Sequence, residues 1–376
     1  MSYNTPYARW AGVGPYYAMF PVSFANEVVL TYTEPGQRIL DPFAGRASSV
    51  FAGAAHGRPS VGIEINPVGW IYGKTKLSPA PADKVKKRIG EIVQIVHGLP
   101  AGTGQDLPEF FKYCFSETTL RFLIAARDSL DWRRTKVDRT LMTLILIDLH
   151  GNRGRSFSNQ MRQSRAMSPD YSIKWWRRHQ LKPPEIDPQK FLEKKIAWRY
   201  AKGLPETVWS TVWLGDSRKL MKKVKEQVAR KNWEPFTLLL TSPPYMGISD
   251  YHRDQWLRLW MLGGAPQASR NQNRYRKDFA SQNVYEELLN GVFQQTAEVM
   301  SESGHVYVRT DARERTFEIT RNALRKAFPC WNEEIIDRPY RKQTQTALYG
   351  DKSKKPGEKD IVLTGPGATS FTCAYR

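Results

Sequence analysis

Short apolar runs separated by segments of helical periodicity recur along the chain and predict a sheet with buried strands. The first run covers residues 38–43, and a helix of small side chains is expected over residues 47–56, after a glycine turn. Strands that alternate with helices are typical of a doubly wound, mostly parallel α/β sheet with helices on both faces. Further strands are expected in residues 60–67, 212–217, 236–240, 305–309 and 331–336, and further helices in residues 251–261, 278–300 and 316–328.

The residues from about 68 to 210 interrupt this pattern. Their apolar positions predict helices over residues 81–97, 116–131 and 140–150. The last of these contains a short apolar run flanked by charge, which favours a buried helix over a membrane span. We therefore predict one sheet-containing domain in two parts, residues 1–68 and 211–376, and an inserted, mainly helical region at residues 69–210.

Polar residues follow several of the predicted strands. Asp41 precedes the turn at Gly45, Glu64 ends the second run, Asp216 ends the third, and Thr-Ser-Pro-Pro-Tyr at 241–245 ends the fourth. Because the carboxyl ends of parallel strands meet at one edge of a sheet, these residues should converge. A helix N-terminus beneath a glycine turn suits the polar end of a nucleotide-like cofactor. An acid about 20 residues after such a turn is placed to accept hydrogen bonds from ribose hydroxyls.

The Ser-Pro-Pro-Tyr sequence suits chemistry on an aromatic amine, which is a poor nucleophile because its lone pair is delocalised into the ring. The Ser242 hydroxyl and a backbone carbonyl held rigid by Pro243 and Pro244 can accept both amine hydrogens and expose the lone pair to an electrophilic methyl group. Tyr245 can stack on an extruded base and hold it in line with the methyl donor. The alternative interpretation is a strand that ends in a proline-rich turn.

On these motifs the chain resembles the S-adenosylmethionine-dependent DNA amino-methyltransferases, whose signatures are Asp-Pro-Phe-x-Gly-x-Gly-Thr and Ser/Asn/Asp-Pro-Pro-Tyr/Phe. The resemblance is clear over about residues 15–68 and 211–250. It implies a Rossmann-like catalytic domain, S-adenosyl-L-methionine as cofactor, and methyl transfer to a base flipped out of duplex DNA. The catalytic residues it implies are Ser242, Pro243, Pro244 and Tyr245, and the cofactor residues are Phe20, Pro21, Asp41, Pro42, Phe43, Gly45, Glu64, Asn66, Asp216 and Ser217.

Two details refine this resemblance. After Gly45 the chain has Arg46-Ala47-Ser48 where the family prefers Ser-Gly-Thr, and Ala47 lacks the freedom of glycine at positive φ. Ser242, in the first position of the tetrapeptide, is more similar to the cytosine-N4 members than to the adenine-N6 members, which mostly carry Asp or Asn. Adenine N6 is the nearest alternative target. An RNA amino-methyltransferase and a catalytically silent nucleic-acid-binding relative are the further alternatives.

The charge of the chain agrees with a nucleic-acid partner. There are 57 Lys and Arg against 37 Asp and Glu, a net charge of +20, which favours salt-dependent binding to phosphate backbones. Residues 151–200 hold 12 basic and 4 acidic residues, 12 − 4 = +8, interleaved with glycines, serines and aromatics. A solvated basic face with two core tryptophans is the alternative interpretation. The predicted DNA-binding residues in the inserted region are Arg153, Arg155, Arg162, Arg165, Lys174, Trp175, Trp176, Arg177 and Arg178.

The remaining signals concern redox chemistry and location. Cys114, Cys330 and Cys373 are widely scattered, so neither a disulfide framework nor a metal site is suggested. Methylation of cytosine C5 needs a cysteine thiolate that attacks the ring. Cys330 in Pro329-Cys330 is best explained as an ordinary cysteine before a strand, which disfavours this chemistry.

With no secretion signal at the N-terminus and no expected membrane span, we predict a cytoplasmic enzyme. A restriction endonuclease partner, a solitary regulatory methylase and a phage protective enzyme stay open alternatives.

Overall fold

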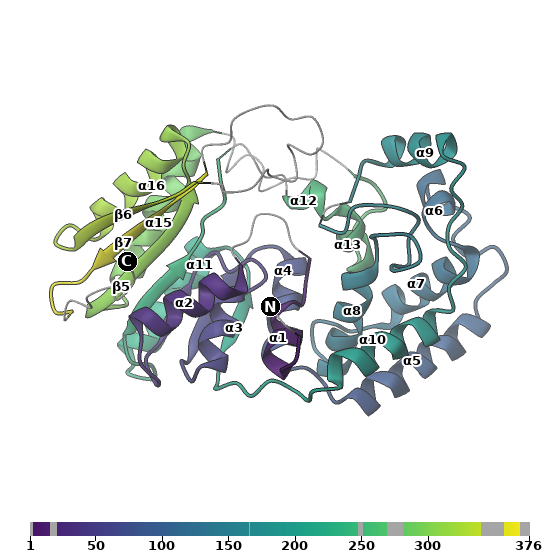
Figure 1. The fold of residues 1–376 in the computed structure, drawn as a ribbon, viewed down its shortest axis with the longest axis horizontal. Coiled ribbons are helices and arrows are strands. Elements are labelled where there is room, and N and C mark those ends of the chain that lie inside the picture. The colour runs from purple at the N-terminus through teal and green to yellow at the C-terminus, as the bar shows by residue number, and fades with distance from the viewer. Residues whose placement is uncertain are drawn as a thin grey trace. The chain divides into compact units, whose positions relative to one another are not determined.

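The structure, a computed structural model, describes residues 3–15, 21–164, 166–246, 251–268, 281–339 and 357–368. The chain divides into two compact units (Figure 1). The helical unit comprises Met1–Met19, Asn66–Glu206 and Asp250–Asn273, and the sheet unit comprises Phe20–Ile65, Thr207–Ser249 and Arg274–Arg376. The functional domain bounds predicted from the sequence stay a prediction.

A seven-stranded sheet of order β3-β2-β1-β4-β5-β7-β6 forms the centre of the sheet unit. Neighbours from β3 to β5 are parallel, whereas β7 pairs antiparallel with both β5 and β6. The predicted doubly wound, mostly parallel α/β sheet is thereby confirmed. The strand order reverses between β1 and β4, which is where open sheets of this kind bind ligands. The strands are β1 (Ile39–Asp41), β2 (Ser60–Glu64), β3 (Thr211–Leu214), β4 (Phe236–Thr241), β5 (Met300–Asp311), β6 (Asn332–Arg338) and β7 (Glu358–Thr364).

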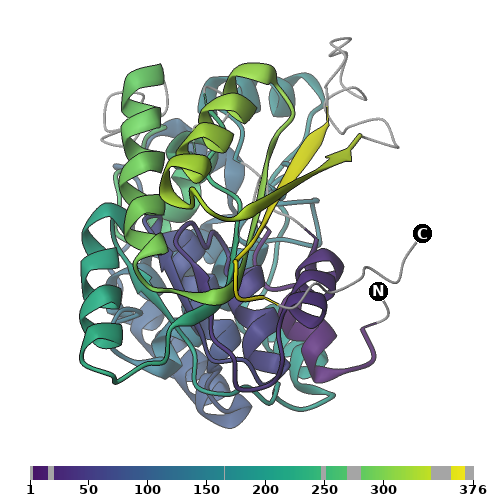
Figure 2. The same ribbon diagram turned by 90° about the vertical axis from the view of Figure 1, so that its left-hand side faces the viewer.

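Helices cover both faces of this sheet. On one face α11 (Ser217–Ala229), α15 (Gln282–Ala297) and α16 (Glu314–Ala327) lie side by side (Figure 2). On the other, α2 (Val22–Tyr32) packs against α3 (Ser48–Ala55). Leu239 belongs to the core on the first face, and Leu238 and Leu240 belong to the core on the second. Because both faces are covered, β4 carries three consecutive leucines at residues 238–240 and does not alternate apolar and polar residues there.

The helical unit carries the helices predicted over residues 81–97, 116–131 and 140–150, as α5, α7 and α8. No helix in the described parts of the chain is long and apolar enough to cross a membrane. The helices of this unit are α1 (Pro6–Ala11), α4 (Pro67–Leu77), α5 (Ala82–His97), α6 (Glu109–Cys114), α7 (Glu117–Ser129), α8 (Lys136–Asp148), α9 (Pro169–Arg178), α10 (Pro188–Tyr200), α12 (Tyr251–Asp254) and α13 (Trp256–Met261).

The prediction of a single helix over residues 251–261 is wrong in one respect. The structure divides this segment into two helices at Gln255. This residue is buried and has φ −109° and ψ 11°. Its side-chain Nε2 donates to the Ser164 carbonyl (3.3 Å), and its Oε1 accepts from Arg258 (2.7 Å). The break thus serves a buried hydrogen-bond network. Trp256 and Trp260 are buried within the helical unit and pack in its core.

Candidate active site

A side-chain hydrogen bond joins the ends of β1 and β4. Thr241 Oγ1 donates to Asp41 Oδ1 (2.6 Å) across 200 positions of sequence. The Ser49 hydroxyl of α3 donates to the other carboxylate oxygen, and the Phe43 N–H donates to Oδ1 (3.1 Å). Asp41 is 1% exposed, so these three donors satisfy a carboxylate that is removed from water. The Asp-Pro-Phe turn and the Thr-Ser-Pro-Pro-Tyr segment therefore meet where the strand order reverses.

Burial raises the pKa of Asp41 to about 6, although hydrogen bonds from Ser49, Thr241 and Phe43 oppose the shift. Removal from water disfavours the charged form of a carboxyl group. The observed role of Asp41 is to fix the turn and to link it to β4. Its predicted contact with a cofactor stays a prediction.

The turn after β1 is also bound to the end of β2. The Gly45 N–H donates to Glu64 Oε2 (2.7 Å), and the Ala44 N–H donates to the Ile63 carbonyl (3.0 Å). The Glu64 carbonyl in turn accepts the Gly215 N–H that follows β3 (2.9 Å). The predicted convergence of strand ends is therefore present at β1, β2 and β3.

Ala47, the departure from the family signature, adopts the left-handed conformation with φ 58° and ψ 48°. Steric contact between Cβ and the following carbonyl makes this conformation cost an L-residue about 1–2 kcal/mol, whereas glycine adopts it freely. Because Ala47 is not helical, α3 begins at Ser48 and not at Ala47 as predicted. The chain therefore keeps a turn here that is strained for the residue it carries.

Close packing behind the turn predicts that replacing two glycines by alanine has opposite effects on stability. A Cβ at Gly62 of β2 would lie 2.8 Å from Val50 Cγ2 and 2.9 Å from the Ala44 Cβ, whereas a Cβ at Gly90 of α5 would meet nothing within 4 Å. Gly62→Ala should therefore lower the free energy of unfolding by about 1–3 kcal/mol. Gly90→Ala should raise it by about 0.5–1 kcal/mol, since alanine favours a helix interior. Urea unfolding of both variants checks this, and an unchanged Gly62→Ala protein would contradict the close packing.

At the end of β3, Asp216 caps α11 by accepting the Arg218 N–H (2.9 Å). The Arg218 guanidinium also donates to both carboxylate oxygens, the shortest contact being 2.7 Å. Burial alone would raise the pKa of Asp216, but the hydrogen bonds and charge of Arg218 outweigh it and lower this pKa. The Ser217 hydroxyl donates to the Pro42 carbonyl and holds α11 against the turn that follows β1, which we call the cofactor turn. Sequence reasoning missed Arg218, whose position two residues after a capping acid is the only signal for it.

The tetrapeptide follows β4 directly. Pro243 is buried, while Ser242, Pro244 and Tyr245 are half-buried. The Tyr245 hydroxyl donates to Glu358 Oε1 (3.0 Å). Burial is the main cause that raises the pKa of Glu358, against the lowering effects of Arg309 and of the Tyr245 hydrogen bond.

Three further predicted cofactor residues are Phe20, Pro21 and Asn66. Phe20 lies outside the described residues, and Pro21 is exposed at the N-cap of α2. Asn66 belongs to the helical unit, where its side chain caps α4 by accepting the Val68 N–H (2.9 Å). Their predicted roles stay predictions.

The residues at the strand ends fit S-adenosylmethionine. Glu64 carries carboxylate oxygens, which suit the hydroxyl donors of a ribose, whereas both carboxylate oxygens of Asp216 accept from Arg218. A carboxylate offers about four acceptor positions, and the Gly45 N–H uses one of those of Glu64. Gly45 itself has φ 53° and carries no Cβ at the turn.

The predicted DNA-binding residues of the helical unit differ in their exposure to solvent. Arg153, Arg155, Lys174 and Arg178 are exposed, whereas Arg165 lies outside the described residues. Arg162 is half-buried, and its carbonyl accepts from His150 Nδ1 (2.7 Å). Burial is the main cause that lowers the pKa of His150 well below its usual value.

Trp176, one of the predicted DNA-binding residues, is buried in the helical unit, and its predicted role in DNA contact stays a prediction. Trp176 is 1% exposed, its Nε1 donates to the Gln160 carbonyl (2.7 Å), and its ring packs near that of Phe110. Trp175 is half-buried against His179, at 4.3 Å between ring centroids. Arg177 is exposed but forms an ion pair with Glu109.

Comparison with known proteins gives one sequence match. The family described as DNA methylase matches residues 2–68 of the chain. None of the curated protein sequences matches. The matched family and the converging strand ends indicate an S-adenosylmethionine-dependent methyltransferase, with S-adenosyl-L-methionine as its cofactor.

Two solved structures are among those similar to the chain. The rRNA methyltransferase aviRa from Streptomyces viridochromogenes is 9% identical, with 94% of this chain and 90% of that chain covered and a TM-score of 0.34. TrmN from Thermus thermophilus is 10% identical, with 96% of this chain and 52% of that chain covered and a TM-score of 0.34. The chain thus spans about half the length of TrmN. The fold assignment rests on the strand order of the sheet itself.

Proposed function

We propose that the protein transfers a methyl group from S-adenosyl-L-methionine to the exocyclic N4 of cytosine in duplex DNA. The observation that carries this proposal is the hydrogen bond between Thr241 and Asp41. It fixes the first residue of the Thr-Ser-Pro-Pro-Tyr segment against the turn that receives the cofactor. An amine held by the next residue, Ser242, would then lie beside the methyl donor without any further movement of β4.

Ser242 and Pro243 prepare the amine for reaction. A hydroxyl oxygen and a carbonyl oxygen accept the two amine hydrogens, and the lone pair then points away from the ring toward the incoming methyl group. S-adenosylmethionine supplies that methyl group as an electrophile. No strong base is required, since the amine becomes acidic once methylated and loses its proton afterwards. Tyr245 stacks on the base and fixes its plane.

The choice of cytosine N4 rests on Ser242 in the first position of the tetrapeptide. A serine hydroxyl is an uncharged acceptor, whereas the Asp or Asn typical of adenine-N6 enzymes offers a carboxylate or amide oxygen. Adenine N6 is the second candidate because the rest of the site would serve either amine. The base must leave the duplex in either case, since its amine is otherwise paired and stacked.

We assign the contact with DNA to the outer face of α9 in the helical unit. Tyr171, Lys174, Trp175 and Arg178 follow one another at three- and four-residue spacing and therefore share one side of this helix. Tyr171 is 55% exposed, while Ser172, Ile173 and Trp176 turn inward.

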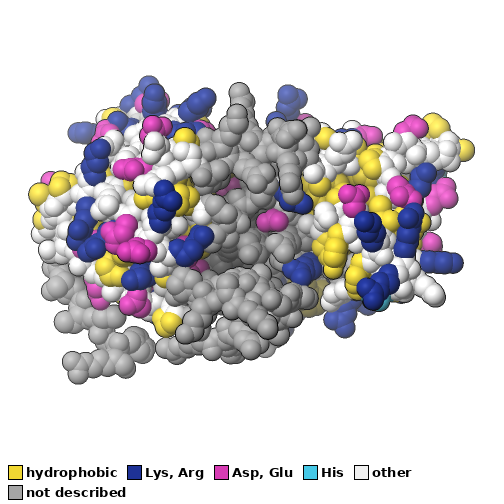
Figure 3. All heavy atoms as spheres, turned by 90° about the horizontal axis from the view of Figure 1, so that it is seen from above, with side chains coloured by type: hydrophobic (Ala, Val, Ile, Leu, Met, Phe, Trp, Pro, Cys, Tyr) yellow, Lys and Arg dark blue, Asp and Glu magenta, His cyan; other side chains and the backbone are white. Residues whose placement is uncertain are grey.

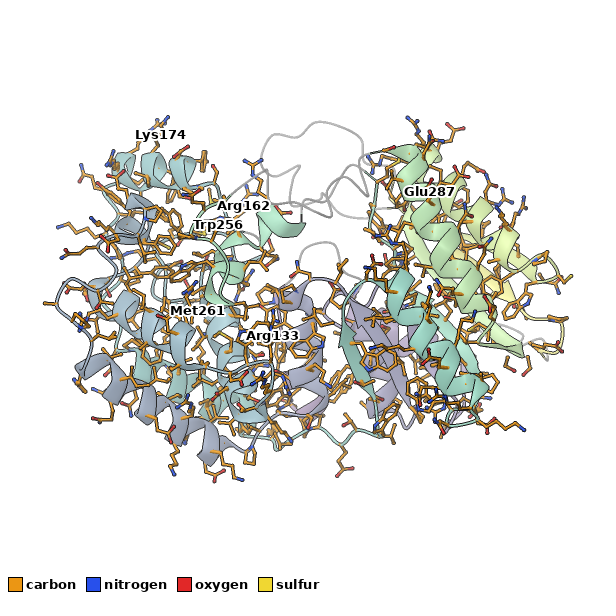
Figure 4. All side chains as sticks on the ribbon, turned by 180° about the vertical axis from the view of Figure 1, so that it is seen from behind. Arg133, Arg162, Lys174, Trp256, Met261 and Glu287 are labelled. Carbon is orange, nitrogen blue, oxygen red and sulfur yellow. The ribbon has the colours of Figure 1, made fainter. Side chains whose placement is uncertain are left out.

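Figure 4 shows Lys174 on the outer side of α9, and Figure 3 shows Lys and Arg side chains over this part of the helical unit, mixed with acidic ones. Cations beside a half-exposed indole can contact phosphates and stack on bases. The pairing of Arg177 with Glu109 makes Arg177 a poorer phosphate ligand than Lys174 or Arg178.

This assignment predicts the salt dependence of DNA binding. Lys174→Ala and Arg178→Ala should each weaken binding and reduce the slope of log K against log salt by about 1, because each removes one phosphate contact. Lys222→Ala, which removes an exposed charge from α11 of the sheet unit, is the matched control. Fluorescence anisotropy of labelled duplex DNA at several salt concentrations measures the slope. Equal slopes in all three variants would place the DNA contact elsewhere.

Methyl transfer from labelled S-adenosylmethionine tests the proposed function. Duplex DNA of mixed sequence and RNA of the same sequence are incubated separately with the protein, and cofactor binding is measured by calorimetry. Label on DNA is expected. Label on RNA alone would move the substrate to RNA, and neither label nor cofactor binding would indicate a catalytically silent relative.

A further inference from the structure

The hydroxyl of Tyr245 is held by a residue far away in the sequence. Glu358, which accepts this hydroxyl at 3.0 Å, is the first residue of β7. Gly357, directly before it, has φ 95°, and a Cβ there would lie 2.7 Å from the Arg338 carbonyl oxygen. The position of Glu358 is therefore set by the backbone at Gly357 and by the pairing of Glu358 with Asp311 of β5.

Glu358 forms a long ion pair with a neighbouring arginine through its Oε2 atom. The nearby Arg309 guanidinium lies 3.7 Å from Glu358 Oε2, but it binds Asp360 much more closely, at 2.6 Å from Nε to Oδ1. Arg338 also binds Asp360 (2.9 Å). Asp360 thus binds the guanidinium groups of both Arg309 and Arg338, and the Oε1 atom of Glu358 accepts the hydroxyl of Tyr245.

A second contact holds the residue that follows. Arg313, at the N-cap of α16, donates from Nη2 to the Met246 carbonyl (3.0 Å) and forms an ion pair with Asp311 at the end of β5. The ends of β5 and β7 therefore hold the tyrosine side chain and the next peptide separately. A tyrosine whose hydroxyl is bound and whose next residue is held at its carbonyl has less freedom to tilt its ring.

We propose that Glu358 is a positioning residue that fixes the plane of the Tyr245 ring against the extruded base. This inference rests on the proposed function, in which Tyr245 stacks on that base. Glu358 acts through Tyr245 and does not itself touch the reacting amine. Its effect should therefore appear in kcat more than in KM, because a tilted ring misaligns the base without removing the groups that bind it.

A double-mutant cycle tests this inference. Glu358→Ala and Tyr245→Phe should each lower kcat about tenfold, as expected for loss of one hydrogen bond to a carboxylate. The double variant should be no slower than either single variant, because both remove the same contact. Glu358→Gln keeps an acceptor oxygen and should restore most of the rate. Glu334→Ala, an exposed glutamate of β6, is the matched control and should not change kcat.

The outcomes are distinct. The positioning role would be overturned by additive losses of kcat in the double variant or by an unchanged kcat in Glu358→Ala. It would also be overturned if Glu358→Ala lowered cofactor affinity and melting temperature along with kcat. If Glu358→Ala fails to fold, the pair of Glu358→Gln and Tyr245→Phe decides the question, since a slow Tyr245→Phe beside a fast Glu358→Gln supports the proposal. A wild-type protein that transfers no methyl group to DNA or RNA would overturn the proposed function itself, whatever the variants do.

Discussion

Ser242→Ala is expected to lower kcat by a factor of about 10²–10³, as for loss of one preorganised group that stabilises a transition state. The Ser242 oxygen is needed most when the amine becomes tetrahedral. The cofactor turn is held by Asp41 and Glu64, neither of which relies on Ser242 among their described hydrogen bonds. Affinity for S-adenosylmethionine should therefore stay within about twofold, well below the tenfold change that corresponds to about 1.4 kcal/mol. Single-turnover methylation and calorimetry measure the two quantities separately.

Tyr245→Ala extends this prediction, because it removes the stacking ring and should abolish methylation with the same small effect on cofactor affinity. Thermal unfolding of both variants is the control. If both lose their folded structure, the segment is a structural strand-and-turn element, and the assignment of Ser242 and Tyr245 to catalysis is contradicted.

Asp41→Ala is expected to lower the free energy of unfolding by about 3 kcal/mol at pH 5, because it leaves buried donors without an acceptor. These donors are the Ser49 and Thr241 hydroxyls and the Phe43 N–H. Cofactor affinity and methyl transfer should fall with it, since the turn loses its link to β4. Thr241→Val is the matched control, because it removes one donor and leaves two, and it should cost only about 1 kcal/mol.

The cost of Asp41→Ala should depend on pH with a definite sign. The folded-state pKa of Asp41 is raised to about 6, so the folded state binds its proton more tightly than the unfolded chain does. The stability that this group contributes is present at low pH and is lost as the pH rises through about 4 to 6. The difference between wild type and Asp41→Ala should therefore shrink by about 1 kcal/mol between pH 5 and pH 7. Urea unfolding at both pH values measures this, and a difference that grows with pH would contradict it.

The sheet and the convergence of its strand ends could be predicted from the sequence because both follow from local patterns. An apolar run such as residues 236–240 indicates a strand covered on both faces, and a polar residue directly after such a run lies at the edge of the sheet. The contact between Asp41 and Thr241 follows from this rule, although the hydrogen bond itself does not.

Other parts of the site depend on contacts between residues far apart in the sequence, which local patterns do not reveal. Nothing in the apolar run of β7 shows that it inserts antiparallel between β5 and β6, so the approach of Glu358 to Tyr245 could not be predicted. Counting charges in residues 151–200 identified a basic segment but not the side of α9 that faces outward. The structure buries Trp176 in the core, which the charge count does not show.

Mass spectrometry of nucleosides identifies the base and the nucleic acid that the protein methylates. Unmethylated duplex DNA is incubated with the purified protein and S-adenosylmethionine, with RNA in parallel, and both are digested to nucleosides. We expect N4-methylcytosine from the DNA sample, and Ser242→Ala should yield none above background. N6-methyladenine in its place would correct the target base, whereas the absence of any methylated nucleoside from a protein that also binds no cofactor would contradict the claim that this is a methyltransferase.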